Sequence, residues 1–125
     1  MVRKRYSWGN IPKLQEDLSA FSNKNHQLQD FLEPYRIAAV KCLPILTTNS
    51  HSQRTGKNKI LPVFEDGNET GLLITEVEAL FGLPTHYTDA CNLSITDRRK
   101  LLGRAWCVPV ITQILKPLAE ELSRL

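Results

Sequence analysis

The stretch Leu101-Leu-Gly-Arg-Ala-Trp-Cys-Val-Pro-Val-Ile111 places an arginine and a tryptophan on a short turn directly before a C-terminal helix. Pro109 suits the first turn of that helix, because proline lacks an N–H and its φ is already helical. A guanidinium and an indole at a helix start can hydrogen-bond to and stack on a flat, partly charged ligand. The alternative is that Trp106 packs the helix start and Arg104 is a solvated cation.

Length and composition describe one small domain or part of one. The chain has 125 residues, 42% of them hydrophobic, and a formal net charge of +3. No apolar run approaches the ~20 residues of a membrane span and the start does not read as a signal peptide, so we expect an intracellular protein without a membrane partner. The three cysteines lack Cys-x-x-Cys spacing and the three histidines do not cluster near them, which favours free thiols over disulfides or a metal site.

Positive charge gathers in three patches that could contact phosphates from several sides, although such patches are also common on solvated faces. The patches are Arg3-Lys4-Arg5, then Arg54 with Lys57 and Lys59, and Arg98-Arg99-Lys100 with Arg104. The middle patch lies in residues 47–59, a wholly polar segment without an acid, which predicts a loop. Its hydroxyls, amides and cations suit bases and phosphates, and the alternative is a surface insertion.

The N-terminal half predicts short elements. Residues 6–10 read as a strand entering a turn, and residues 15–29 as a linker with one or two helical turns. A helical turn at 28–32 ends before Pro34, and residues 37–46 are apolar enough for one strand or two. Residues 60–64 return as a strand, followed by a turn at Asp66-Gly67-Asn68.

The C-terminal half predicts three helices. Thr75 and Glu78 have the spacing of a capping box, and Gly82 with the following proline ends that helix. Ser94 or Thr96 caps a second helix that runs to Leu102. The final helix enters at Pro109 and is kinked at Pro117. Its apolar residues recur at three-to-four spacing, which predicts burial of Val108, Ile111, Leu115, Leu118 and Leu122.

Three further segments accompany residues 101–111. They are Arg3-Lys-Arg-Tyr-Ser-Trp-Gly-Asn-Ile-Pro12, Phe81-Gly-Leu-Pro-Thr-His-Tyr-Thr-Asp89, and a 47–64 segment that starts with Thr-Thr and ends with Pro-Val-Phe. In this order they resemble motif VIII with its following strand, motif IX and the target-recognition loop of the de novo DNA (cytosine-5)-methyltransferases, and residues 101–111 resemble motif X. Only residues 13–27 lack a clear counterpart.

This resemblance implies an α/β fold, namely the C-terminal portion of a Rossmann-like S-adenosylmethionine-dependent methyltransferase domain plus a small target-recognition subdomain. The whole chain, 1–125, would be one partial domain. Its parts would be a motif VIII strand at 1–12, a linker at 13–34, a target-recognition segment at 35–68, and motifs IX and X with the C-terminal helices at 69–125. We expect Trp8, Phe64, Phe81 and Trp106 of such a part to lack packing partners, and its sheet edges to be open to aggregation.

The family transfers a methyl group from S-adenosylmethionine to a cytosine flipped out of DNA. The resemblance implies that Arg3 contacts the flipped base with Arg5 in support, and that Arg104 and Trp106 contact the cofactor. It implies a nuclear protein with DNA as its partner. The residues that it places at the DNA are Thr48, Asn49, Arg54, Lys57, Lys59 and Lys100.

The sequence departs from the family in its catalytic motifs. It contains no Pro-Cys dipeptide, no Glu-Asn-Val and no glycine-rich first strand, so we expect no catalytic residue in this chain and no methyl transfer by it alone. Asn49 and Ile95 stand where family members place arginines that contact DNA. The alternatives to a methyltransferase fragment are a catalytically inactive regulatory relative that acts through self-association, and a separate basic DNA-binding module.

Self-association is implied by three residues. His86, Asp89 and Arg98 match a set through which family members pair across a symmetric interface, as homo- or hetero-oligomers. Arg98 could bind the carboxylate of the partner's Asp89, and twofold symmetry would double the contact. The alternative is a cluster within one chain, with Asp89 capping the turn and Arg98 solvated.

Overall fold

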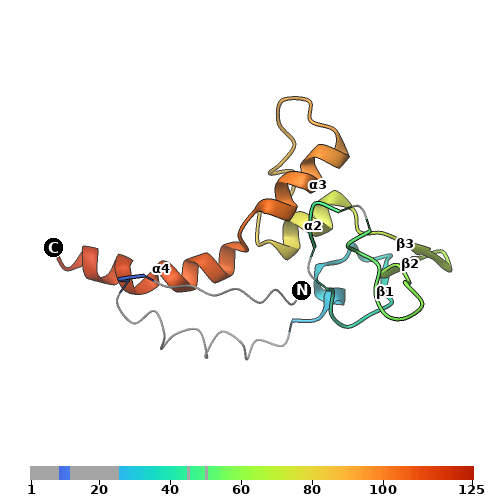
Figure 1. Ribbon diagram of the computed structural model, residues 1–125, viewed down its shortest axis with the longest axis horizontal. Helices are drawn as coiled ribbons and strands as arrows, with labels where there is room; N and C mark the ends of the chain where they lie inside the picture. The colour runs from blue at the N-terminus through green and yellow to red at the C-terminus, as the bar shows by residue number, and fades with distance from the viewer. Residues whose placement is uncertain (1–8, 12–25, 45, 50) are drawn as a thin grey trace.

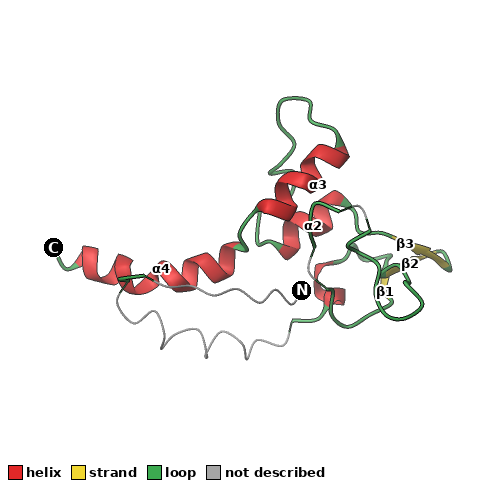
Figure 2. Cartoon of the chain, in the orientation of Figure 1, coloured by secondary structure: helices red, strands yellow, loops and turns green. Residues whose placement is uncertain are grey.

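The computed structural model of the protein describes residues 9–11, 26–44, 46–49 and 51–125 (Figure 1). It is a small mixed α/β structure with a three-stranded antiparallel sheet in the order β1-β2-β3 and two helices, α2 and α3, beside it. A further helix, α4, extends away from this body, and long loops connect the short elements (Figure 2). The elements are η1 (Leu28–Phe31), β1 (Ile37–Ala38), β2 (Val63–Glu65), β3 (Asn68–Thr70), α2 (Ile74–Leu80), α3 (Ile95–Arg104) and α4 (Val108–Ser123).

The sheet is built on a tight hairpin. Val63 pairs with Thr70 and Glu65 with Asn68, so that Asp66 and Gly67 alone form the turn. Both have positive φ, 51° and 79°, which is the geometry of a two-residue hairpin whose twist matches its strands. The predicted turn is therefore confirmed.

The strands are shorter than predicted. Of the described residues between 37 and 46, only Ile37–Ala38 form a strand. The chain then bends, and Lys41 O accepts a hydrogen bond from Leu28 N (2.9 Å) instead of from a neighbouring strand. The strand predicted at 60–64 begins only at Val63, directly after Pro62, which has no N–H for a ladder.

The core lies between η1, the sheet, α2 and α3, and α2 packs on both η1 and α3. Phe81 is completely buried in it, so the expectation that this residue lacks packing partners is wrong. Phe64 and Trp106 remain 37% and 47% exposed, and Trp8 lies outside the described residues. The buried apolar side chains are Leu28, Leu43, Leu46, Val63, Leu72, Val77, Leu80, Phe81 and Leu102.

The N-cap of helix α2 lies two residues before the predicted one at Thr75. Leu73 is the N-cap, and its N–H donates to Glu76 Oε1 over 2.8 Å. The assignment of this role to Thr75 and Glu78 is therefore wrong, because Thr75 already lies inside the helix. The predicted end is confirmed, since Gly82 adopts φ +75° directly after the last turn.

Helix α3 starts and ends close to its prediction. Ser94 is the N-cap, and its Oγ accepts a hydrogen bond from Asp97 N (3.1 Å). The helix continues to Arg104, two residues beyond the predicted end at Leu102. Phe81 O then accepts a hydrogen bond from Val108 N (2.8 Å), which ties the start of α4 to the end of α2.

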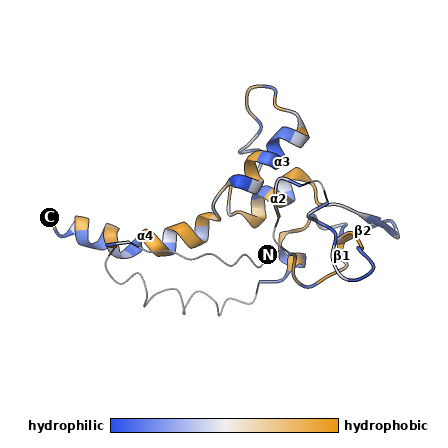
Figure 3. Cartoon of the chain, viewed as in Figure 1, coloured by the Kyte–Doolittle hydropathy of each residue, from blue (hydrophilic) through white to orange (hydrophobic). Residues whose placement is uncertain are grey.

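The predicted burial of the apolar stripe on α4 is wrong. Val108, Leu115, Leu118 and Leu122 are 36–59% exposed, because α4 packs on none of the other described elements (Figure 3). Ile111 is half-buried, whereas the buried side chains of this helix are those of Ile114 and Pro117. Pro117 lies inside the helix, as predicted.

Several predictions fall on residues that the structure does not describe. The strand at 6–10 lies almost wholly outside the described residues, as do residues 13–25 of the linker. The helical turn before Pro34 is confirmed by η1.

Among the helices of the described ranges, none combines the length and the apolar character that a membrane span requires.

Candidate nucleic-acid interface

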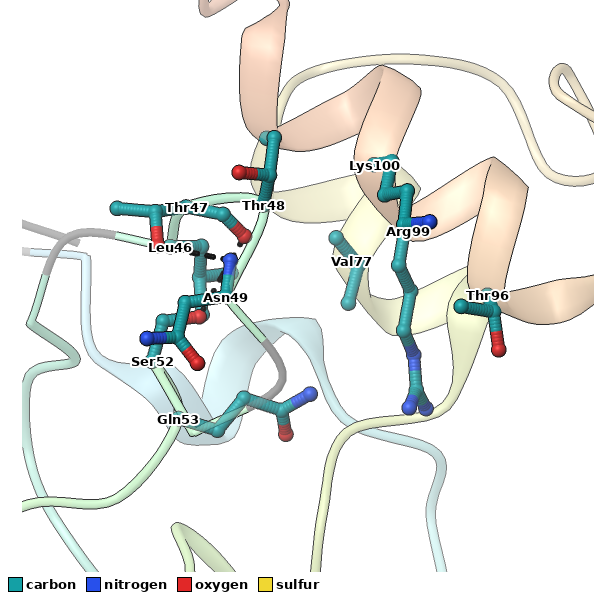
Figure 4. A pocket seen from close by; sticks show the side chains of 11 residues that line it. Leu46, Thr47, Thr48, Asn49, Ser52, Gln53, Val77, Thr96, Arg99 and Lys100 are labelled. Carbon is teal, nitrogen blue, oxygen red and sulfur yellow. Dashed lines mark hydrogen bonds between the residues drawn. The ribbon is translucent and has the colours of Figure 1, made fainter.

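A cavity of about 310 Å³ lies between the segment that follows Leu46 and helix α3 (Figure 4). Two cations of α3 lie on one side, and hydroxyl and amide groups of the loop lie on the other. None of the described lining residues is acidic, and the walls combine apolar surface with polar and positively charged groups. The lining residues are Leu46, Thr47, Thr48, Asn49, Ser52, Gln53, Val77, Thr96, Arg99, Lys100 and Gly103.

A glycine inside α3 brings the loop against the helix. A Cβ atom at Gly103 would lie 2.7 Å from the carbonyl carbon of Thr47 and 2.8 Å from Thr48 N, closer than side-chain atoms approach a backbone. Glycine lowers the stability of a helix interior by about 1 kcal/mol relative to alanine. The close packing of the loop on the helix explains why a glycine stands at this position. Gly103 therefore fixes the width of the cavity.

The loop wall is shaped by its own short side chains. Thr47 Oγ1 accepts a hydrogen bond from Asn49 N (3.1 Å), and Asn49 Oδ1 accepts one from His51 N (2.9 Å). Such side-chain turns let polar residues hold a loop without a regular element. Further on, Thr55 and Ile60 exchange two backbone hydrogen bonds, which close residues 56–59 into a tight turn. The loop predicted over 47–59 is confirmed for its described residues.

The peptide groups of Leu72 hold two side chains of the cavity. Leu72 N donates to Gln53 Oε1 over 2.7 Å, and Leu72 O accepts from Arg99 Nη2 over 2.7 Å. Leu72 is 1% exposed and Gln53 is 9% exposed, so the bond between them is shielded from water, whereas the bond from the exposed Arg99 is only partly buried. Gln53 and Arg99 are thus fixed in place by the same buried residue.

Three of the residues predicted to contact DNA meet at this cavity. Thr48 and Asn49 come from the loop and Lys100 comes from α3, and all three line the same space. They are far apart in the sequence, so the fold brings them together. Asn49 and Lys100 are exposed and remain accessible from solution.

The other residues predicted at the DNA lie apart from the cavity or outside the described residues. Lys57 and Lys59 belong to the tight turn beyond the cavity, and Arg54 lies directly before it. All three are exposed, and Arg54 Nη1 donates to Lys59 O (3.1 Å). Arg3 and Arg5, assigned to the flipped base, lie outside the described residues.

The residues predicted to contact the cofactor occupy the exposed connection between α3 and α4. Arg104 is the last residue of α3, and Trp106 is 47% exposed. Neither lines the cavity. A guanidinium and an indole this close together fit one wall of a nucleoside site by residue type, because they supply a stacking face and hydrogen-bond donors.

The residues predicted to pair two copies lie together within one chain. His86 and Asp89 are exposed on the turn before α3, and Arg98 Nη1 lies 3.9 Å from Asp89 Oδ1. Arg98 itself is 5% exposed, and its Nη2 lies 3.1 Å from Glu78 Oε1. The expectation that Arg98 is solvated, which belonged to the alternative of a cluster within one chain, is therefore wrong. Pairing of two copies stays a prediction.

Glu78 anchors this turn from inside the protein. Burial by itself raises the pKa of this carboxyl, but hydrogen bonds from Thr88, Arg98 and His86 outweigh it and hold the pKa of Glu78 below its ordinary value. The donors include His86 N at 2.7 Å and Thr88 N at 2.9 Å. The ionised carboxylate therefore holds a turn in which His86 has a φ of 64°.

The sequence did not single out Gln53 or Gly103, whereas Arg99 belongs to one of the basic patches that it predicted could contact phosphates. A glycine within a helical pattern signals a close approach and could have identified Gly103. Gln53 carries no such signal, because its position depends on a hydrogen bond from the N–H of Leu72. No protein-family model matches the sequence.

Proposed function

We propose that the chain is the C-terminal part of a DNA (cytosine-5)-methyltransferase domain and that it supplies the DNA-recognition surface. The finer fold would be the last portion of a Rossmann-like methyltransferase domain with a small recognition subdomain. The observation that carries the proposal is the meeting of Thr48, Asn49 and Lys100 at one acid-free cavity. These are the residues that the resemblance to the methyltransferases assigns to DNA.

The chemistry of the surface supports a nucleic-acid partner. Lys100 and the cations of the adjacent turn, Arg54, Lys57 and Lys59, suit phosphates, which dominate the affinity of proteins for DNA. The hydroxyls and amides of the loop suit base edges or sugar oxygens. Loop and helix would therefore contact the duplex as one unit, held at a fixed spacing by Gly103.

The remaining assignments follow the same proposal. S-adenosylmethionine, when bound, would supply the methyl group, and Arg104 with Trp106 would form one wall of its site. The sequence contains no Pro-Cys and no Glu-Asn-Val, so this chain is assigned recognition of DNA and no chemical step. The protein would act in the nucleus.

The second candidate is a catalytically inactive relative that assembles with methyltransferase subunits. The exposure of His86 and Asp89 on an anchored turn favours it, because a held loop can present side chains to a partner. Incubation with labelled S-adenosylmethionine and CpG DNA, with and without an active methyltransferase subunit, separates the two candidates. Stimulation of the active subunit supports the second candidate, and transfer by the chain alone contradicts both.

Salt-dependent DNA binding tests the recognition surface. The full 125-residue chain is titrated into a fluorescent CpG duplex at several salt concentrations, and binding is read by fluorescence anisotropy. Lys100→Gln removes one phosphate contact and should lower the slope of log K against log salt by about 0.9. Lys116→Gln, an exposed lysine on α4, is the matched control and should leave the slope unchanged. Identical slopes for the two variants would exclude Lys100 from the interface.

A further inference from the structure

We propose that Gln53 and Arg99 form a binding site for one phosphate group of a nucleotide inside the cavity. The inference rests on the proposed function, because it names the part of the nucleic acid that the cavity receives. It concerns two residues that the resemblance to the methyltransferases does not assign to DNA.

The amide of Gln53 has a fixed orientation and an unused donor. Its Oε1 accepts from Leu72 N (2.7 Å), so Nε2 is the opposite end of the amide. Within the described part of the chain, Nε2 has no hydrogen-bond partner, although Gln53 is only 9% exposed. Nε2 itself keeps some exposure to solvent, so it is available to donate to a ligand acceptor in the cavity.

Arg99 brings an unneutralised charge to the same place. Its Nη2 donates to Leu72 O (2.7 Å), which leaves the remaining N–H groups of the guanidinium for a ligand. In Figure 4 this guanidinium and the Gln53 amide face each other across the cavity. No carboxylate of the described residues pairs with Arg99, whereas the buried Arg36 and Arg98 each pair with glutamates.

These groups select an anion that is rich in acceptors. Arginine N–H groups match the oxygens of a phosphate or a carboxylate. The amide N–H beside them adds a donor for a third oxygen, which a phosphate has and a carboxylate lacks. Leu72 holds both side chains in advance, so binding loses little side-chain freedom. Lys100, at the same cavity, adds a second positive charge.

The size of the cavity indicates a nucleotide. Its volume of about 310 Å³ exceeds that of a phosphate and lies at the lower end of the range for small-molecule sites. Thr48, Asn49 and Thr96 line the remaining space with groups that can hydrogen-bond to a sugar or a base. A phosphate with its attached nucleoside therefore fits the walls better than a phosphate alone.

The test uses the full chain and cytidine 5′-monophosphate as the probe, with binding measured by calorimetry. Gln53→Glu keeps an oxygen for Leu72 N and replaces the unused donor with a negatively charged oxygen. Gln113→Glu, on α4 and outside the cavity lining, makes the same change in net charge. The Kd should rise at least about tenfold in Gln53→Glu and less than about twofold in Gln113→Glu. Equal Kd values for the two variants, or no binding by the parent chain, would overturn the proposal.

Arg99→Gln provides a second reading if Gln53→Glu does not fold by circular dichroism. It should also weaken binding of the mononucleotide at least about tenfold, with Arg124→Gln as the control at an exposed position. An unchanged Kd in Arg99→Gln overturns the site. Inorganic phosphate should compete with the mononucleotide at higher concentration, and failure to compete at any concentration overturns the assignment of the site to phosphate.

Failure of the site and failure of the proposed function give different results. If the chain binds the CpG duplex in a salt-dependent way but does not bind the mononucleotide, the phosphate site is excluded and the proposed function is supported. If the chain binds the mononucleotide through Gln53 but does not bind the duplex, the phosphate site is supported and the proposed function is contradicted. Loss of duplex binding in Gln53→Glu but not in Gln113→Glu supports both.

Discussion

Helix α2 carries two buried glutamates, Glu76 and Glu78, and each pairs with an arginine from a different part of the chain. Glu76 pairs with Arg36, which precedes β1, and Glu78 pairs with Arg98 of α3. Residues two apart on a helix point to different sides, so the two pairs hold α2 from opposite directions. One pair ties α2 to the sheet, and the other ties it to α3.

The two pairs differ in how much the glutamate depends on its arginine. Arg36 Nε lies 3.0 Å from Glu76 Oε1, Nη1 lies 2.7 Å from Glu65 Oε2, and Nη2 donates to Gly71 O (2.6 Å). Glu76 has one other donor, the backbone N–H of Leu73. With both partners about 1% exposed, Arg36 is the main counterpart of the Glu76 charge.

Glu78, in contrast, has several donors besides its arginine. It accepts from the backbone N–H groups of His86 and Thr88 and from the Thr88 hydroxyl, in addition to Arg98. A buried carboxylate can therefore be stabilised either mainly by a countercharge, as in Glu76, or mainly by a turn of backbone donors, as in Glu78. The first arrangement should be the more sensitive to loss of its arginine.

Arg36→Met should therefore have the largest effect. It leaves Glu76 charged and buried with a single N–H donor, and removing one partner of a buried ion pair costs about 3–5 kcal/mol in the free energy of unfolding. Urea unfolding followed by circular dichroism at pH 7 measures this. Arg124→Met is the control, since its pair with Glu121 is 62–73% exposed and should change the stability by less than about 0.5 kcal/mol. A loss at Arg36 no larger than at Arg124 would contradict the comparison.

Arg98→Met should cost less, about 1.5–3 kcal/mol, because it removes one charged hydrogen-bonding partner while Glu78 keeps the donors of His86 and Thr88. The same unfolding experiment measures it beside Arg36→Met. A loss equal to or above that of Arg36→Met would show that the donors of the turn do not compensate for the arginine.

The local parts of this architecture could be predicted from the sequence. The Asp66-Gly67 turn, the Ser94 N-cap and the Gly82 helix end depend on one or two residues whose backbone preferences act within a few positions. The loop over 47–59 follows from its polarity. The two ion pairs could not be predicted, because charged residues are normally exposed and only the packing of distant segments buries these four.

The candidate site divides in the same way. Thr48, Asn49 and Lys100 were assigned to DNA from the resemblance, and the structure places them at one cavity. Arg99 was part of a predicted basic patch, but its placement opposite Gln53 could not be predicted, because both side chains are held by tertiary hydrogen bonds to Leu72. The apolar stripe of α4 predicted burial, but periodicity indicates only which face is apolar, and the described residues place no other element against that helix.

Thr88→Val tests how much the hydroxyl of the turn contributes to the stability of the Glu78 site. The Thr88 hydroxyl donates to Glu78 Oε1 and accepts from Arg98 Nε (2.9 Å), so it links carboxylate and guanidinium. Valine keeps the shape but removes the hydroxyl, which should cost about 1 kcal/mol in the free energy of unfolding. Combined with Arg98→Met, the loss should be smaller than the sum of the two single losses, since both act on one network. Strict additivity would argue against a shared network.

The smallest effect is a pH dependence that belongs to Glu78. Because the folded protein holds the pKa of Glu78 below its ordinary value of 4.5, the native state binds fewer protons than the unfolded chain as pH falls through this range. The stability gained from the ionised carboxylate is complete above the unfolded pKa and is lost as pH falls through the folded pKa. Glu78→Gln does not titrate at this position and serves as the reference.

The difference in unfolding free energy between the parent chain and Glu78→Gln should thus stay constant from pH 8 to about pH 6 and shrink below about pH 4.5. Urea titrations across this range measure it, and Gln113→Glu reports the effect of an added, half-buried carboxylate on α4. A difference that persists undiminished to about pH 3 would show that the turn binds Glu78 equally well when it is protonated. The hydrogen bonds from His86 and Thr88 would then stabilise the protonated and the ionised carboxyl equally. In that case the turn would not replace the countercharge that Arg36 supplies to Glu76.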